Sequence, residues 1–194
     1  MIETTILLIR HGQTPTTGIV LPGRAPGLHL SDQGRQQAER VAQQLKERFP
    51  LVDAVHTSPL ERTRQTAEPT ARTFGLVPVN NAAFIECDFG DWTGKKLADL
   101  SKLPEWQTVQ KTPSQFRFPG GESFTDMQDR VVAGIESVAA QHPGGVVACF
   151  SHADPIKTAI THYRGMNLDE FQKATAEPAS VTTIEFCEGV GRIV

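Results

Sequence analysis

Two arginines and two histidines lie in polar segments that follow short apolar runs of the sequence. Residues of these types could together hold and transfer a phosphoryl group. Arg10 and His11 directly follow the apolar run 5–9 and are themselves followed by Gly12. Arginine supplies a permanently charged fork that suits phosphate oxygens, and histidine supplies an imidazole that can act as a nucleophile, a base or a ligand. Arg62 and His152 lie in two further polar segments, each placed after another apolar run.

The three polar segments are predicted to meet at one edge of a sheet. Residues 5–9, 52–57 and 146–150 are short, apolar and rich in β-branched side chains, which is typical of buried strands. Polar residues follow each of them, at 10–12, 57–62 and 151–152. Parallel strands end at the same edge, where ligands of α/β proteins usually bind. Two arginines and two histidines would form a compact positive site there, and its simplest ligand is a phosphoryl group.

Strand-like and helix-like segments alternate along the chain, which predicts an α/β fold. Helices are expected after the caps Ser31 and Ser123, after His152, and over 58–75 with Pro59 near the first helical position. Further strands are expected at 77–79 and 181–186, while residues 84–121 are irregular and suggest an insertion or a lid. We expect one domain, residues 1–194, built as a three-layer α/β/α sandwich with a mostly parallel central sheet.

Composition limits the possible partners and the compartment. The chain is 39% hydrophobic and 21% charged, with a net charge of −3, which argues against a general nucleic-acid binder. No segment is long and apolar enough to cross a membrane, and no leader is recognisable. The cysteines, Cys87, Cys149 and Cys187, are odd in number and widely spaced, so neither a disulfide framework nor a zinc motif is expected. A cytoplasmic protein is predicted, and its oligomeric state is left open.

Five segments resemble the histidine phosphatase superfamily, which includes the cofactor-dependent phosphoglycerate mutases. They occur in the family's order and span nearly the whole chain: LIRHGQT at 8–14, TSPLERTRQTA at 57–67, ECDFGDWTG at 86–94, FPGGES at 118–123 and FSH at 150–152. The resemblance implies a phosphoglycerate mutase-like fold and a small phosphorylated substrate. It implies no metal and no other cofactor.

The resemblance also implies a role for each matching residue. His11 matches the nucleophile that becomes phosphohistidine, and Arg10, Arg62 and His152 match the groups that hold the phosphoryl oxygens. Fixed cations there would stabilise the charge of the transferring group. Glu86 matches the residue that donates a proton to the departing oxygen, for which its carboxyl pKa must be raised by desolvation.

Three positions differ from the family pattern or have no clear counterpart in it. An asparagine that often follows the nucleophile is absent, and Thr17 is the residue whose hydroxyl could replace its contact. Glycine often follows the second histidine, but here Ala153 and Asp154 do, and the Asp154 carboxylate would either disfavour anionic substrates or orient a polar one. Arg24 lies in a Gly/Pro-rich loop and is predicted to bind substrate, with a solvated surface charge as the alternative.

Phosphomonoester hydrolysis is the favoured function. A mutase is the alternative, but residues 94–120 lack the paired arginines with which mutases hold a second acidic group. A catalytically idle phosphate-binding or protein-binding module is the other alternative, and the complete set of two histidines, two arginines and Glu86 argues against it.

Overall fold

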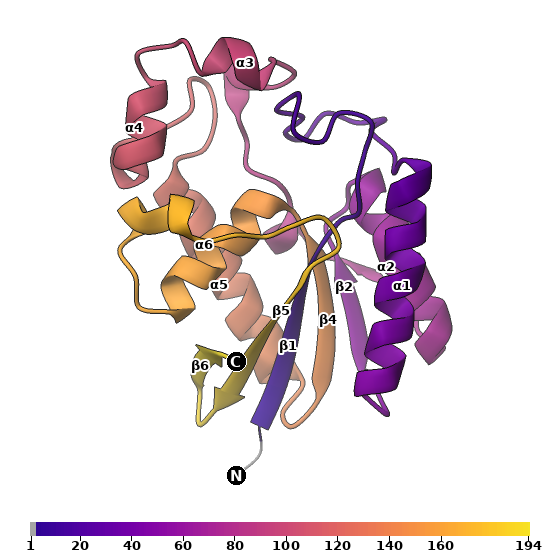
Figure 1. Cartoon of the computed structure of the whole chain (residues 1–194). Helices are drawn as coiled ribbons and strands as arrows, with labels where there is room; N and C mark the ends of the chain where they lie inside the picture. The colour runs from indigo at the N-terminus through magenta and orange to yellow at the C-terminus, as the bar shows by residue number, and fades with distance from the viewer. Residues whose placement is uncertain (1–2) are drawn as a thin grey trace.

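A six-stranded mixed sheet forms the centre of the molecule, and the computed structural model describes residues 3–194 (Figure 1). The strand order is β3-β2-β4-β1-β5-β6. The pairs β1–β4, β2–β4 and β2–β3 are parallel, whereas β5 and β6 add antiparallel pairs at one side. The strand bounds are β1 Glu3–Arg10, β2 Ala54–Thr57, β3 Val79–Asn80, β4 Val146–Ser151, β5 Val181–Cys187 and β6 Val190–Ile193.

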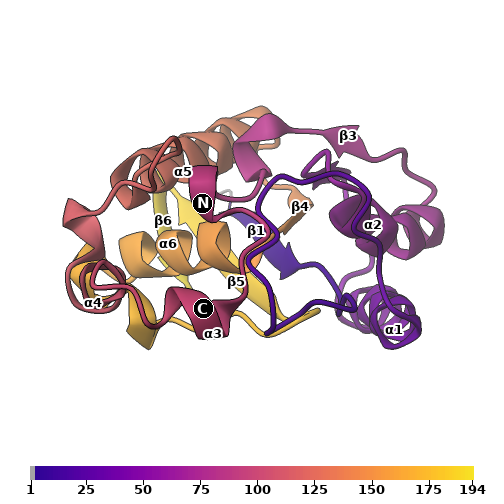
Figure 2. The same ribbon diagram turned by 90° about the horizontal axis from the view of Figure 1, so that it is seen from above.

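Helices cover both faces of this sheet, which confirms the predicted α/β/α sandwich. The helices α1 (Asp32–Arg48) and α2 (Glu61–Phe74) pack on one face, and α5 (Phe124–Gln141) and α6 (Ala153–Tyr163) pack on the other (Figures 1 and 2). Two short helices, α3 (Leu97–Leu100) and α4 (Trp106–Lys111), lie beyond the carboxyl ends of β1, β2 and β4 (Figure 1). Four 3-10 helices occupy Ala82–Phe84, Gly90–Trp92, Pro113–Gln115 and Leu168–Lys173.

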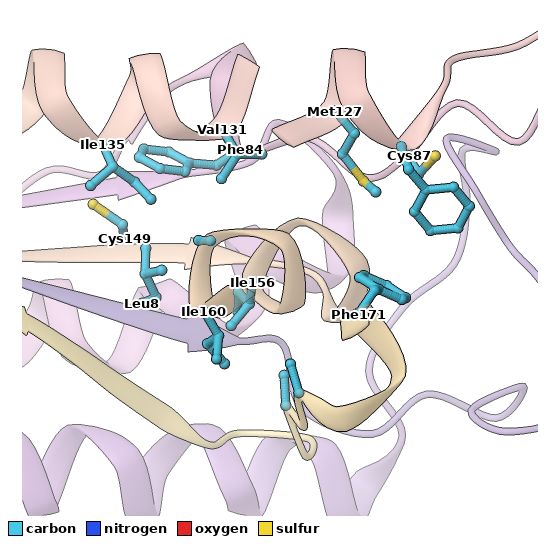
Figure 3. Close-up of a cluster of buried hydrophobic side chains, with 14 of the residues drawn as sticks. Leu8, Phe84, Cys87, Met127, Val131, Ile135, Cys149, Ile156, Ile160 and Phe171 are labelled. Atoms are coloured by element: carbon cyan, nitrogen blue, oxygen red, sulfur yellow. The ribbon is translucent and has the colours of Figure 1, made fainter. Parts of the chain in front are cut away.

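The period-2 pattern of β1 divides the core into two halves. Leu7 and Ile9 face α1 and α2, whereas Ile6 and Leu8 belong to the larger cluster on the side of α5 and α6. Figure 3 shows part of that larger cluster, in which Met127, Val131 and Ile135 of α5 face side chains of the sheet and of α6. Burial on both faces holds the sheet rigidly, which fixes the positions of the residues at its carboxyl edge.

Serine caps set the N-termini of two long helices. Ser31 caps α1 by accepting a hydrogen bond from the Gly34 amide, and Ser123 caps α5, both as predicted. The structure adds that Ser123 forms a capping box with Asp126. The prediction for Pro59 was wrong, because α2 begins at Glu61 and its N-cap is Leu60 with extended backbone. Residues 58–60 therefore connect β2 to α2 outside either element, with bends at Pro59 and Leu60.

A close backbone approach ties α1 to the loop after β1. A Cβ built on Gly34 would lie 2.0 Å from the carbonyl oxygen of Gln13, and one built on Gly12 would lie 2.5 Å from the carbonyl oxygen of Gly34. Both positions therefore require glycine for lack of space. Within residues 3–194, no helix is both long and apolar enough to cross a membrane.

Candidate active site

The three polar segments meet where the sequence predicts, at the carboxyl ends of β1, β2 and β4. The His11 amide donates to the carbonyl of Ser151 at 3.0 Å, and the Ser58 amide donates to the carbonyl of Phe150 at 2.9 Å. The imidazole rings of His11 and His152 lie edge to face with centroids 5.3 Å apart. Figure 2 looks down on this edge, with α3 above the sheet.

The ring of His11 is set up to present a lone pair. Its Nδ1 lies 2.7 Å from the carbonyl oxygen of Gly12. A carbonyl only accepts hydrogen bonds, so Nδ1 carries the proton and Nε2 carries the lone pair. Burial, together with the cations of Arg62 and Arg10, lowers the His11 pKa to about 3. The imidazole is therefore neutral and nucleophilic through the whole physiological pH range.

Both arginines bring buried N–H groups that have no partner among the described residues, 3–194. Arg62 is 0% exposed, and its Nη2 donates to the carbonyl of Gly23 at 2.8 Å. Its Nε and Nη1 are buried without a hydrogen-bond acceptor in residues 3–194. Arg10 donates through Nη1 to the carbonyl of Ala176 at 2.7 Å, while its Nε is likewise unpartnered. Buried polar groups are nearly always hydrogen-bonded, so several unpartnered donors at one place indicate an anion-binding site.

His152 completes the group that we call the phosphoryl cradle, which consists of Arg10, His11, Arg62 and His152. Its Nε2 lies 2.8 Å from the Oγ of Ser58. Its Nδ1 is buried, has no hydrogen-bond partner within the described part of the chain, and lies 3.8 Å from a Glu86 carboxyl oxygen. Burial lowers the pKa of His152 well below its ordinary value, and the nearby arginines add to this effect.

Glu86 stands beside the phosphoryl cradle with its carboxyl group out of water. The residue is 6% exposed, and one carboxyl oxygen accepts a hydrogen bond from the Cys87 amide at 2.9 Å. Burial and the negative charge of Asp154 raise the Glu86 pKa to about 7, against the opposing attraction of Arg62 and Arg10. A carboxyl group with this pKa can give and take a proton near neutral pH.

Arg24 contacts the segment that carries Glu86. Its Nε donates to the Glu86 carbonyl at 2.8 Å, and its Nη2 donates to the carboxylate of Glu122 at 3.3 Å. Its Nη1 also lies 3.9 Å from the carboxylate of Asp88. These contacts give Arg24 a part in fixing the Glu86 backbone, and a role in substrate binding stays a prediction.

Arg130 and Glu122 extend this support, and the sequence analysis gave a role to neither of them, although Glu122 lies in the FPGGES segment. Arg130 of α5 donates through Nη1 to the carbonyls of Ala83 and Ile85 at 2.8 and 3.0 Å, and through Nε and Nη2 to Glu122 at 2.9 and 3.0 Å. Glu122 also accepts from the amide of Asp88 at 3.1 Å. Together with Arg24 they form what we call the Glu86 clamp, which consists of Arg24, Glu122 and Arg130.

A cavity of about 370 Å³ opens beside the phosphoryl cradle, of which Arg10 and His11 line it. Thr17 lines it, and the Oγ of Thr17 accepts from the Thr14 amide at 2.9 Å and lies 3.0 Å from the Oγ of Thr14, where either hydroxyl can be the donor. Asp154 and Lys157 of α6 also line it. The rest of the wall is largely aromatic and aliphatic, including Leu21, Phe89, Trp92, Trp106, Phe118 and Phe171.

Fold and site together define an α/β enzyme of phosphoryl transfer, with a neutral histidine at the centre of an anion site. The chain belongs to the histidine phosphatase superfamily (branch 1), whose family model matches residues 6–194. The relatives of this chain include both phosphatases and a mutase.

Named relatives resemble the chain over most of its length. Phosphoserine phosphatase 1 of Hydrogenobacter thermophilus is 30% identical over 188 residues, which cover 94% of this chain and 87% of that protein. The 2,3-bisphosphoglycerate-dependent phosphoglycerate mutase of Thermoplasma acidophilum is 27% identical, over 97% of this chain and 89% of the relative. The solved structure of YhfR from Bacillus stearothermophilus superposes with a TM-score of 0.90 at 26% identity, covering 98% and 95% of the two chains.

Proposed function

We propose that this protein hydrolyses small phosphomonoesters without a metal ion, through a phosphohistidine intermediate on His11. The observation that carries the proposal is the set of buried guanidinium N–H groups of Arg10 and Arg62 that have no partner within residues 3–194, on two cations close enough to lower the pKa of the His11 imidazole. Such donors stabilise the negative charge on the oxygens of a transferring phosphoryl group, and they need no reorganisation during the reaction.

In the first half-reaction the Nε2 of His11 attacks phosphorus and the bond from phosphorus to the ester oxygen breaks. The departing oxygen takes the proton of the Glu86 carboxyl group, so an alcohol leaves instead of an alkoxide. The phosphoryl group then remains on His11, where Arg10, Arg62 and His152 hold its oxygens.

In the second half-reaction the Glu86 carboxylate takes a proton from a water molecule that attacks the phosphohistidine. The nitrogen–phosphorus bond breaks, inorganic phosphate forms, and the neutral imidazole of His11 returns. Glu86 is protonated again, so one group with a pKa near neutrality serves first as acid and then as base.

Hydrolysis is favoured over mutase chemistry by the charge of the cavity wall. Beyond Arg10, His11 and Glu86, the charged side chains on the wall within residues 3–194 are Asp154 and Lys157, one of each sign. A second phosphate or carboxylate would therefore meet one cation and one anion. A mutase, in contrast, must hold an intermediate with two acidic groups while that intermediate reorients in the site. The mutase relative keeps the alternative open to test by product analysis.

The first test measures phosphate release from 4-nitrophenyl phosphate in the presence of a chelator. Wild type is expected to release phosphate, His11→Ala to release none, and wild type quenched during turnover to carry an acid-labile phosphoryl group on His11. Equal release by both proteins would contradict the assignment of the nucleophile. Conversion of one phosphoglycerate isomer into another without phosphate release would favour a mutase.

We extend the proposal to a cytoplasmic location, which fits the buried thiols of Cys87 and Cys149.

A further inference from the structure

One carboxylate on the cavity wall has no hydrogen-bond or ion-pair partner in the part of the chain that the structure describes. Asp154 is the second residue of α6, and it lines the cavity two positions after His152 of the phosphoryl cradle. Within residues 3–194 its carboxylate accepts no hydrogen bond and forms no ion pair. It interacts electrostatically with Lys157 and Arg10 without contacting them. An acid in the first turn of a helix stabilises the helix dipole, but that role does not require the side chain to face a cavity.

Lys157 lies one turn further along α6 and is held by other groups. Its Nζ donates to the side-chain oxygen of Gln172 at 3.1 Å and lies 3.9 Å from the centre of the Phe171 ring. Lys157 therefore does not neutralise Asp154 by contact. The two charges occupy separate places on a wall that is otherwise mostly apolar.

The apolar surroundings of Asp154 strengthen the attraction between its carboxylate and a cation. Aromatic and aliphatic side chains make up most of the wall, and charges attract more strongly where water is scarce. A phosphoryl group held in the cradle leaves the rest of the substrate in this cavity. An ammonium group supplies both the positive charge and the N–H donors that the Asp154 carboxylate lacks.

We propose that Asp154 is a specificity-determining residue that selects phosphomonoesters whose leaving group carries an ammonium group. The substrate class is the O-phosphorylated amino alcohols. It includes the O-phosphorylated amino acids, whose carboxylate would contact Lys157. This inference rests on the proposed hydrolase function, because it assigns the leaving-group side of the same site.

The test compares three esters of nearly equal size: 2-aminoethyl phosphate, 2-hydroxyethyl phosphate and n-propyl phosphate. The measured quantity is the ratio of kcat/KM for the aminoethyl ester to kcat/KM for the propyl ester, in wild type and in Asp154→Asn. Comparing proteins at fixed substrates cancels the intrinsic reactivity of each ester. The ratio also cancels any general loss of activity, including one caused by a changed Glu86 pKa.

The ratio is expected to fall about 10- to 100-fold in Asp154→Asn, the effect of one lost hydrogen bond between charged groups. Asp154→Ala, as a second variant, should lower the ratio at least as far. Asp91→Asn changes an exposed carboxylate that does not line the cavity, and it should leave the ratio as in wild type.

Three results would overturn the inference. The first is an unchanged ratio in both Asp154 variants. The second is a wild-type kcat/KM for the propyl ester that equals the kcat/KM for the aminoethyl ester. The third is equal preference for the hydroxyethyl ester, which would mean that Asp154 recognises any hydrogen-bond donor. In each case 4-nitrophenyl phosphate is still hydrolysed, whereas failure on that ester as well would refute the hydrolase function itself.

Discussion

Replacing Glu86 with glutamine separates proton donation from phosphoryl binding. The change keeps the size of the buried side chain and removes the acidic proton near the ester oxygen. Loss of a general acid costs about 10²- to 10⁴-fold in rate when the leaving group needs a proton. An alkoxide needs one, whereas 2,4-dinitrophenoxide is already a stable anion.

We therefore expect Glu86→Gln to lower kcat/KM about 10²- to 10⁴-fold for n-propyl phosphate, and less than about tenfold for 2,4-dinitrophenyl phosphate. The quantity kcat/KM covers the steps up to departure of the alcohol, so the later role of Glu86 as a base does not enter. The assay is initial-rate phosphate release at pH 6, where the Glu86 pKa of about 7 leaves most of the carboxyl groups protonated.

The pH dependence of the rate provides an independent test of Glu86 as the proton donor. The protonated form of Glu86 is the active acid, so the activity advantage of wild type over Glu86→Gln on the propyl ester is constant below pH 7. It falls tenfold per pH unit above pH 7, as the carboxyl group ionises. Substrate ionisation is the same for both proteins and cancels. Equal losses on both esters, with no change in the advantage across pH, would show that Glu86 acts by binding.

Three further predictions concern the supports of the site. Glu122→Gln weakens the ion pair with Arg130 and should lower kcat/KM on n-propyl phosphate about tenfold, with a smaller loss on the dinitrophenyl ester; Glu39→Gln, in an exposed ion pair, should change neither rate. Inorganic phosphate should raise the Tm of wild type by mass action, and Arg62→Met should abolish most of that increase. The variant should not lower the Tm measured without phosphate, because it removes a buried, partly unpartnered charge. A phosphate effect as large as in wild type would contradict the anion site. Gly34→Ala should reduce the free energy of unfolding in urea by about 1–3 kcal/mol, because the added methyl group meets a backbone carbonyl; unchanged stability would mean that the loop after β1 moves aside freely.

The catalytic edge of the sheet could be predicted because its residues are tied to strand ends. Arg10, His11 and His152 follow apolar runs whose burial is readable from composition, and parallel strands end at a common edge. Arg62 follows from the same logic, as the second residue of the helix after β2. No long-range detail was needed beyond the parallel arrangement of three strands.

The Glu86 clamp could not be predicted, because most of its contacts join residues that are far apart in the sequence. Arg24 and Glu122 are 98 residues apart, and Arg130 is 47 residues from Ala83, whose carbonyl it contacts. The FPGGES motif marked Glu122, but it gave no partner for it. Strand β6 (Val190–Ile193) was missed because only four residues, half exposed, carry its signal.

The unpartnered N–H groups of the phosphoryl cradle also bear on how the catalytic cycle ends. Inorganic phosphate carries the same kind of oxygens as the ester, so the donors of Arg10 and Arg62 hold the product as they hold the substrate. We expect release of phosphate to be slow and free phosphate to compete with the ester. Turnover would then follow the ratio of ester to phosphate around the enzyme, so that abundant phosphate slows the reaction that produces more of it.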